Sequence, residues 1–109
     1  MKVAVTGASG FVGQHILACL LKRDVEIVAV SRDVNRLARF SKDVQTLEMD
    51  ISSTPSDCFE KMGRPDALIH LAWEGLPNYK SLHHFETELP KQYNFLKSII
   101  KSGLPSLLV

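Results

Sequence analysis

The feature that most constrains this chain is a run of evenly spaced glycines near its start, Gly7, Gly10 and Gly13, in the stretch TGASGFVG. Branched apolar residues in KVAVT, residues 2–6, precede the run and predict a short buried strand. Apolar residues at helical spacing follow it over residues 11–23. The glycines by themselves are compatible with a simple turn or with a backbone that approaches a phosphate.

The rest of the chain continues this alternation of strands and helices. Further strands are expected at 25–30, 45–50, 66–73 and 105–109. Further helices are expected at 33–40, 55–62 and about 80–101, the last perturbed or restarted at Pro90. This alternation predicts an α/β fold, a doubly wound, Rossmann-like parallel sheet with strand order 3-2-1-4-5. Residues 1–109 are expected to form one dinucleotide-binding domain. Because the chain ends on an apolar run without a cap, we expect it to be cut short after the fifth strand.

Composition and charge exclude several classes of protein. Thirteen basic and twelve acidic side chains give a net charge of +1, which supplies little attraction for nucleic acid or an anionic membrane. No apolar run is long enough for a signal-peptide core or a membrane span. Cys19 and Cys58 have no disulfide or metal-ligand spacing, and we expect two buried free thiols. The chain is therefore expected to be cytoplasmic, without a nucleic-acid or membrane partner and without a metal.

The glycine loop lies at the place where such a fold binds ligands. In an open parallel sheet this place is the switch point, here between the first and fourth strands. Gly7 would allow a sharp exit from the strand, Gly10 would let the backbone approach a pyrophosphate, and Gly13 would let the helix pack close to the sheet. N–H groups at the helix start would face the anion. A dinucleotide cradle is therefore favoured over a structural turn, with Gly7, Ser9, Gly10, Phe11, Val12 and Gly13 as its residues.

The end of the second strand indicates which nicotinamide cofactor binds. A carboxylate at that position would bind the adenosine ribose hydroxyls, but this chain has Ser31, Arg32 and Asp33 there. Arg32 could pair with a 2′-phosphate or stack on adenine, so NADP is favoured over NAD. The alternatives are that Arg32 is a solvated loop residue, that Asp33 caps the next helix, and that Arg36 either joins Arg32 or faces solvent.

Three motifs in order resemble one protein family. TGASGFVG after the first strand, MDI at 49–51 and HLAW at 70–73 are similar to the extended short-chain dehydrogenase/reductase superfamily, in its branch of NAD-dependent epimerases and dehydratases. The resemblance implies that Asp50 and Ile51 flank the adenine. It also implies that a backbone segment runs along the cofactor, comprising Leu71, Ala72 and Trp73.

The resemblance also implies a catalytic pair spaced Tyr-x-x-x-Lys. Tyr93 and Lys97 have this spacing, but they precede the fifth strand, whereas the family's pair follows it. We therefore predict that Tyr93 is a core or interface aromatic and that residues 1–109 contain no catalytic residue. Many members of the family carry an asparagine in the helix before the fifth strand, and the position that corresponds to it here, by spacing alone, is Glu88.

Other polar residues receive structural interpretations. His70 is predicted to be a hydrogen-bonded core histidine, and His83 and His84 are predicted to be solvated. Substrate contact and surface packing are equally favoured for the loop residues Trp73, Glu74, Tyr79 and Lys80.

Two function classes follow. The leading expectation is the cofactor-binding half of an NAD(P)-dependent oxidoreductase or epimerase whose small-molecule substrate is a nucleotide-sugar or a related carbonyl compound. The alternative is a non-catalytic sensor or regulatory domain that binds NAD(P). The sequence is also compatible with a homodimer.

Overall fold

The computed structural model describes residues 1–73 and 84–108. A parallel sheet with the order β3-β2-β1-β4-β5 forms its centre, which confirms the predicted fold class and strand order. The strands are β1 (Lys2–Thr6), β2 (Glu26–Ser31), β3 (Gln45–Glu48), β4 (Ala67–His70) and β5 (Ser106–Leu108).

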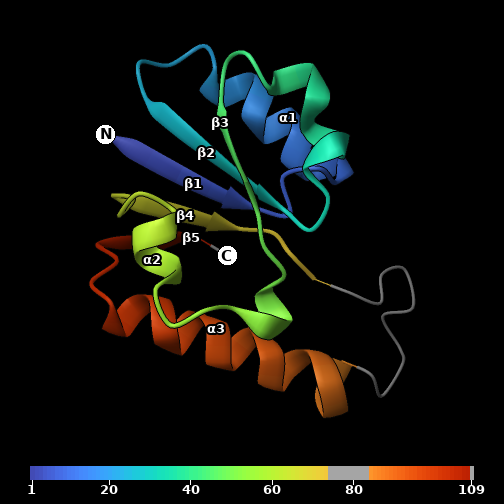
Figure 1. Cartoon of the computed structure of the whole chain (residues 1–109), viewed down its shortest axis with the longest axis vertical. Coiled ribbons are helices and arrows are strands. Elements are labelled where there is room, and N and C mark those ends of the chain that lie inside the picture. The colour runs from blue at the N-terminus through green and yellow to red at the C-terminus, as the bar shows by residue number, and fades with distance from the viewer. Residues whose placement is uncertain (74–83, 109) are drawn as a thin grey trace.

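Helices cover both faces of this sheet. Figure 1 shows α1 (Phe11–Leu20) on one side and α2 (Cys58–Lys61) and α3 (Leu89–Lys101) on the other. Three further helical segments connect these elements, the 3-10 helices η1 (Val34–Phe40) and η2 (Ile51–Ser53) and the π-helix η3 (His84–Glu88).

Several predicted helices differ from the observed ones. The segment after Asp33 is a 3-10 helix, although Asp33 caps it as expected and accepts a hydrogen bond from the Asn35 N–H at 3.0 Å. The helix expected over 55–62 is short, because Thr54 before Pro55 is extended and regular helix begins at Cys58.

The long last helix restarts at Pro90, as predicted. The structure places Pro90 in the first turn of α3, directly after the π-helix η3. Proline is tolerated there because the N–H groups of the first turn have no partner within the helix.

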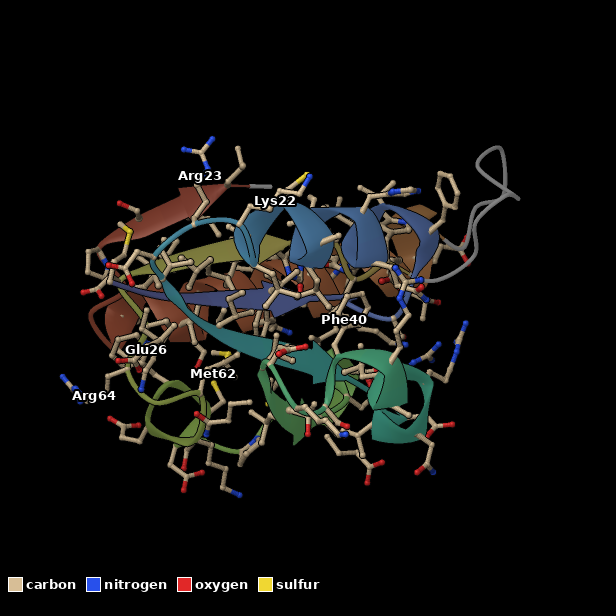
Figure 2. All side chains as sticks on the ribbon, turned by 90° about the horizontal axis from the view of Figure 1, so that it is seen from above. Lys22, Arg23, Glu26, Phe40, Met62 and Arg64 are labelled. Carbon is tan, nitrogen blue, oxygen red and sulfur yellow. The ribbon has the colours of Figure 1, made fainter. Side chains whose placement is uncertain are left out.

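The core has two parts, one on each face of the sheet. Val3 and Val5 of β1 pack with α1 and η1, whereas Ala4 between them packs with α2 and α3. This period-two alternation assigns nearly every residue of the inner strands to one core or the other. In Figure 2, Arg23 and Arg64 project from the molecule, while Phe40 and Met62 lie among the packed elements and are buried.

The two cysteines differ. Cys58 is buried, as predicted, and burial raises the pKa of its thiol. Cys19 is exposed, so the expectation of two buried thiols is wrong for it. The reason is geometric, because Cys19 lies on α1 away from the stripe that faces the sheet through Leu17 and Gly13.

All strands run in the same direction, so their carboxyl ends meet at one edge of the sheet. Figure 1 shows that α1 begins at this edge and that the chain enters α3 from the same side. The loops that follow β1, β2 and β4 are therefore neighbours in space although they lie far apart in the sequence.

Candidate functional site

Gly7 and Gly13 are required by the fold of the loop after β1. Gly7 has φ +65°, and a Cβ there would lie 2.8 Å from the Ala72 nitrogen. A Cβ on Gly13 would lie 2.3 Å from the Gly7 carbonyl oxygen. The loop after β1 therefore packs tightly against both the start of α1 and the loop after β4.

Gly10 differs from these two glycines. It is exposed, has ordinary extended backbone angles as the N-cap of α1, and a Cβ there would meet only the Gly7 oxygen, at 3.4 Å. No side chain of the described residues caps the start of α1, and no acidic residue lies in its first turn. The N–H groups of this turn are thus available to an anion, with the helix dipole in the favourable direction.

A cavity of about 590 Å³ lies at this edge of the sheet. It collects residues from the loops after β1, β2, β3 and β4. Eleven of the thirteen residues predicted to bind cofactor line it, namely Gly7, Ser9, Gly10, Val12, Gly13, Ser31, Arg32, Ile51, Leu71, Ala72 and Trp73. The sequence thus predicted most of one continuous groove from four separate segments.

The other two predicted residues, Phe11 and Asp50, do not line this cavity. The Phe11 side chain is 82% exposed and packs edge-on against His15, 4.7 Å between ring centroids. Asp50 caps η2 by accepting hydrogen bonds from the N–H and the hydroxyl of Ser52 at 2.9 and 2.7 Å, and these bonds lower the pKa of its carboxyl.

The end of β2 is organised by Ser31. Its hydroxyl lies 3.0 Å from the Ser9 hydroxyl, donates to the Asp33 carbonyl at 3.1 Å and accepts from the Asp33 N–H at 3.2 Å. These contacts join the glycine loop to the loop after β2. Arg32, Asp33 and Arg36 all line the cavity, so two cationic side chains and one carboxylate come from this segment.

His70 is the predicted hydrogen-bonded core histidine. It is buried at the end of β4, with Thr6 on one ring nitrogen and Gln92 on the other. Burial lowers the pKa of His70 below its ordinary 6.5, while the hydrogen bond to Gln92 and the charge of Glu88 oppose this. The ring is therefore neutral near pH 7.

Glu88 and Gln92 are the main residues of this region that sequence analysis missed or left without a role. Both are buried, and the Gln92 amide nitrogen donates to the Glu88 carboxylate and to the Ala72 carbonyl, each at 2.7 Å. Their spacing of four residues on a helix was a usable signal for contact between them. Nothing in the sequence indicated that they reach β4.

Tyr93 does not belong to the core. It is 61% exposed, and Lys97 lies over its ring at 5.7 Å from the centroid. Of the predicted core or interface role, the core alternative is wrong, because α3 turns Phe95 and Ile99 toward the sheet and Tyr93 away from it. The interface alternative stays a prediction. The Tyr93–Lys97 pair is not among the residues that line the cavity.

Several residues that were given a predicted role are not among the described side chains. Glu74, Tyr79, Lys80 and His83 lie outside the described residues, and the side chain of His84 is also not described. Over residues 1–73 and 84–108, no group of three or more potential ligands could hold a metal ion. In the same residues, none of the helices combines the length and apolarity that crossing a membrane requires.

Comparison with known proteins agrees with this geometry. Residues 3–108 match the model of the NAD dependent epimerase/dehydratase family. The chain belongs to this family. The resemblance drawn from the three motifs is thereby confirmed, and with it the nicotinamide class of cofactor.

Two curated proteins are similar to this chain in sequence. The chain is 24% identical over 110 residues to a dTDP-6-deoxy-L-talose 4-dehydrogenase (NAD(+)) from Aggregatibacter actinomycetemcomitans, covering 100% of this chain and 40% of the relative. A segment of 32 residues is 53% identical to a CDP-abequose synthase from Salmonella typhimurium, covering 29% of this chain and 11% of that protein. The chain thus spans 40% of the length of the first of these relatives.

Solved structures share the fold. A UDP-glucose-4-epimerase from Stenotrophomonas maltophila, with bound NAD and formylated UDP-arabinopyranose, superposes with a TM-score of 0.80 at 21% identity, covering 98% of this chain and 35% of that one. The UDP-Glc/GlcNAc 4-epimerase from Campylobacter jejuni gives 0.81 at 19% identity, covering 97% and 35%.

Proposed function

We propose that residues 1–109 are the dinucleotide-binding domain of an NAD(P)-dependent oxidoreductase or epimerase that acts on a nucleotide-linked sugar. The observation that carries this proposal is the cavity at the switch point, where an uncapped helix start, the exposed Gly10 and three other loops meet. The substrate class is supported by the relatives, whose names describe enzymes of dTDP-, CDP- and UDP-linked sugars.

The residues present fit a dinucleotide. Gly10 has no packing reason to be glycine, since a Cβ there would be tolerated by the protein itself, but a side chain would take up space in the groove. The N–H groups at the start of α1 would hold the pyrophosphate. Bound nicotinamide would supply the hydride chemistry, while this chain's own residues bind and orient the dinucleotide.

The adenosine half is proposed to lie at the ends of β2 and β3. Ser31 and Arg32 would contact the adenosine ribose, and Ile51 would pack against the adenine. Asp50 would support this contact indirectly by capping η2, which begins at Ile51. The cavity residues next to these, Met49 and Val30, add an apolar wall suited to a purine.

NADP is proposed as the preferred cofactor. Arg32, and not a carboxylate, follows directly on β2, while Asp33, which also lines the cavity, uses its side chain to cap η1. Arg32 and Arg36 both line the cavity at this end, where a 2′-phosphate would be placed.

Titration of NADPH and NADH into the intact protein, followed by fluorescence or calorimetry, tests the proposal. Gly10→Val is expected to weaken binding of both by at least about tenfold, or about 1.4 kcal/mol, with little change in the free energy of unfolding. The matched control is Ala38→Val, which adds similar bulk at an exposed position of η1 outside the cavity. Unchanged affinity in Gly10→Val, or no binding by the wild type, would contradict the proposal.

The enzymatic part of the proposal needs its own experiment. The intact protein should interconvert a nucleotide-linked sugar with turnover that depends on the nicotinamide cofactor. Tight dinucleotide binding without turnover on dTDP-, CDP- and UDP-linked sugars would instead favour a sensor or regulatory domain.

A further inference from the structure

Because the adenosine half of the cofactor is proposed to lie at the ends of β2 and β3, the nicotinamide half would lie toward the end of β4. A network of buried hydrogen bonds lies at this end of the groove. The Thr6 hydroxyl at the end of β1 lies 2.6 Å from His70 Nδ1. His70 Nε2 meets the Gln92 amide oxygen, and the Gln92 amide nitrogen reaches the Ala72 carbonyl and Glu88 Oε1 at 2.7 Å each. These bonds connect β1, β4 and α3.

The Ala72 carbonyl fixes the orientation of the Gln92 amide and, because burial lowers the pKa of His70 and keeps its ring neutral, the direction of the remaining hydrogen bonds in this network. The Ala72 carbonyl oxygen can only accept, so the group of Gln92 that faces it must be the NH₂. The Gln92 oxygen then faces His70, and His70 Nε2 must carry the proton. Neutral His70 therefore accepts at Nδ1 from the Thr6 hydroxyl, whose oxygen accepts the Leu71 N–H at 3.1 Å.

This arrangement engages both donors and the acceptor oxygen of the Gln92 amide. The Gln92 side chain is 3% exposed. Thr6 is fully buried, and the Phe95 ring stacks on His70 at 5.0 Å between centroids. Water has little access, so a broken bond would leave a polar group without compensation.

The segment held by this network lines the proposed cofactor groove. The Leu71 N–H and the Ala72 carbonyl are tied to opposite ends of the network, and both residues line the cavity. There is little room for the segment to shift, because a Cβ at Gly7 would already be 2.8 Å from the Ala72 nitrogen. The position of Ala72 therefore affects the width of the groove at the glycine loop.

We infer that Gln92 and His70 are positioning residues that clamp the Leu71–Ala72 backbone, and with it the Glu88 carboxylate, at the nicotinamide half of the dinucleotide groove. This inference rests on the proposed function. Neither Gln92 nor His70 lines the cavity, whereas Thr6 and Glu88 do. Gln92 and His70 act by holding the loop after β4 at a fixed distance from the glycine loop after β1.

The test compares three variants of the intact protein. Gln92→Leu keeps the bulk of the side chain but removes every hydrogen bond, and Thr6→Val removes the bonds at the other end with almost no change in shape. Phe95→Leu is the packing control, because it removes the ring that stacks on His70 and loosens the same cluster but leaves every hydrogen bond of the network in place. Circular dichroism identifies the folded variants. Thr6 itself lines the cavity, so if Gln92→Leu does not fold, hydrogen exchange in Thr6→Val, rather than its affinity, provides the test.

Dinucleotide affinity should fall about tenfold in Gln92→Leu and Thr6→Val and should remain at the wild-type value in folded Phe95→Leu. Thr6→Ser, which keeps the hydroxyl, should restore binding. Wild-type affinity in both hydrogen-bond variants, or an equal loss in Phe95→Leu, would overturn the inference.

A second readout does not depend on any cofactor. Hydrogen exchange at the Leu71 and Ala72 amides should accelerate in Gln92→Leu and Thr6→Val but not in Phe95→Leu. If the wild type binds no dinucleotide, the proposed function fails, and exchange rates alone then decide whether the clamp exists. Unchanged exchange in both hydrogen-bond variants would refute it.

Discussion

Replacing Gly13 by alanine should destabilise the protein although Gly13 is within a helix and has helical backbone angles. The added Cβ would lie 2.3 Å from the Gly7 oxygen and 2.8 Å from two backbone atoms of Ala8. None of these atoms belongs to a flexible side chain, so the loop or α1 must move by close to an ångström. Overpacking of this kind costs up to about 3 kcal/mol, and the better helix propensity of alanine returns about 1 kcal/mol.

The expected net effect is therefore a loss of about 2 kcal/mol in the free energy of unfolding. Urea denaturation of the intact protein at constant m-value measures it. Gly10→Ala is the internal control, since its Cβ would make one contact at 3.4 Å and its backbone angles suit alanine, so its stability should change by less than about 1 kcal/mol. If Gly13→Ala is as stable as Gly10→Ala, the close approach between α1 and the loop is not real.

Three further outcomes follow from the same structure. Arg32→Ala should narrow the difference between the affinities for NADPH and NADH. The control Arg23→Ala removes the same charge far from the cavity and should leave this difference unchanged. Equal affinities for the two cofactors in the wild type would refute the NADP preference. Because burial lowers the pKa of His70, the unfolded chain gains a proton near pH 6.5 before the folded chain does, so the free energy of unfolding should fall as the pH decreases from 6.5 toward the folded pKa. Glu88 and Gln92 oppose the effect of burial and narrow this pH window. Urea titrations in which the wild type shows no such fall relative to His70→Gln would contradict this. A thiol reagent should label Cys19 rapidly and Cys58 only on unfolding, and comparable rates in the native protein would argue against the burial of Cys58.

The sequence was sufficient for the fold because its local signals agree with one another. The buried strands KVAV and EIVAV, the glycine loop and the caps each predict the same parallel topology, and the structure has that topology. The boundaries were less accurate where a local interaction competes with regular helix. The Asp33 cap holds η1 as a 3-10 turn, and Pro55 forces Thr54 into an extended conformation, so α2 begins late.

The candidate site was predictable where one motif supplies both position and chemistry. The glycine loop and Ser31–Arg32 leave the ends of neighbouring strands, so their meeting follows from strand order alone. Phe11 was predicted to bind through its place in the motif; its side chain is exposed at the start of α1 and does not line the cavity, and its binding stays a prediction. Tyr93 is not in the core, since an apolar spacing on a helix does not say which of two stripes faces the core.

The contacts between motifs were beyond the reach of sequence patterns. Gly7 is constrained by Ala72, sixty-five positions away, through a clearance of 2.8 Å that no local pattern encodes. Ala72 in turn is held by Gln92, whose place in α3 looks like that of any polar helix residue. The shape of the groove therefore depends on contacts among three segments that are distant in the sequence: the glycine loop, the loop after β4 and α3. A substitution at Gln92 could then alter dinucleotide binding while leaving every glycine of the loop unchanged.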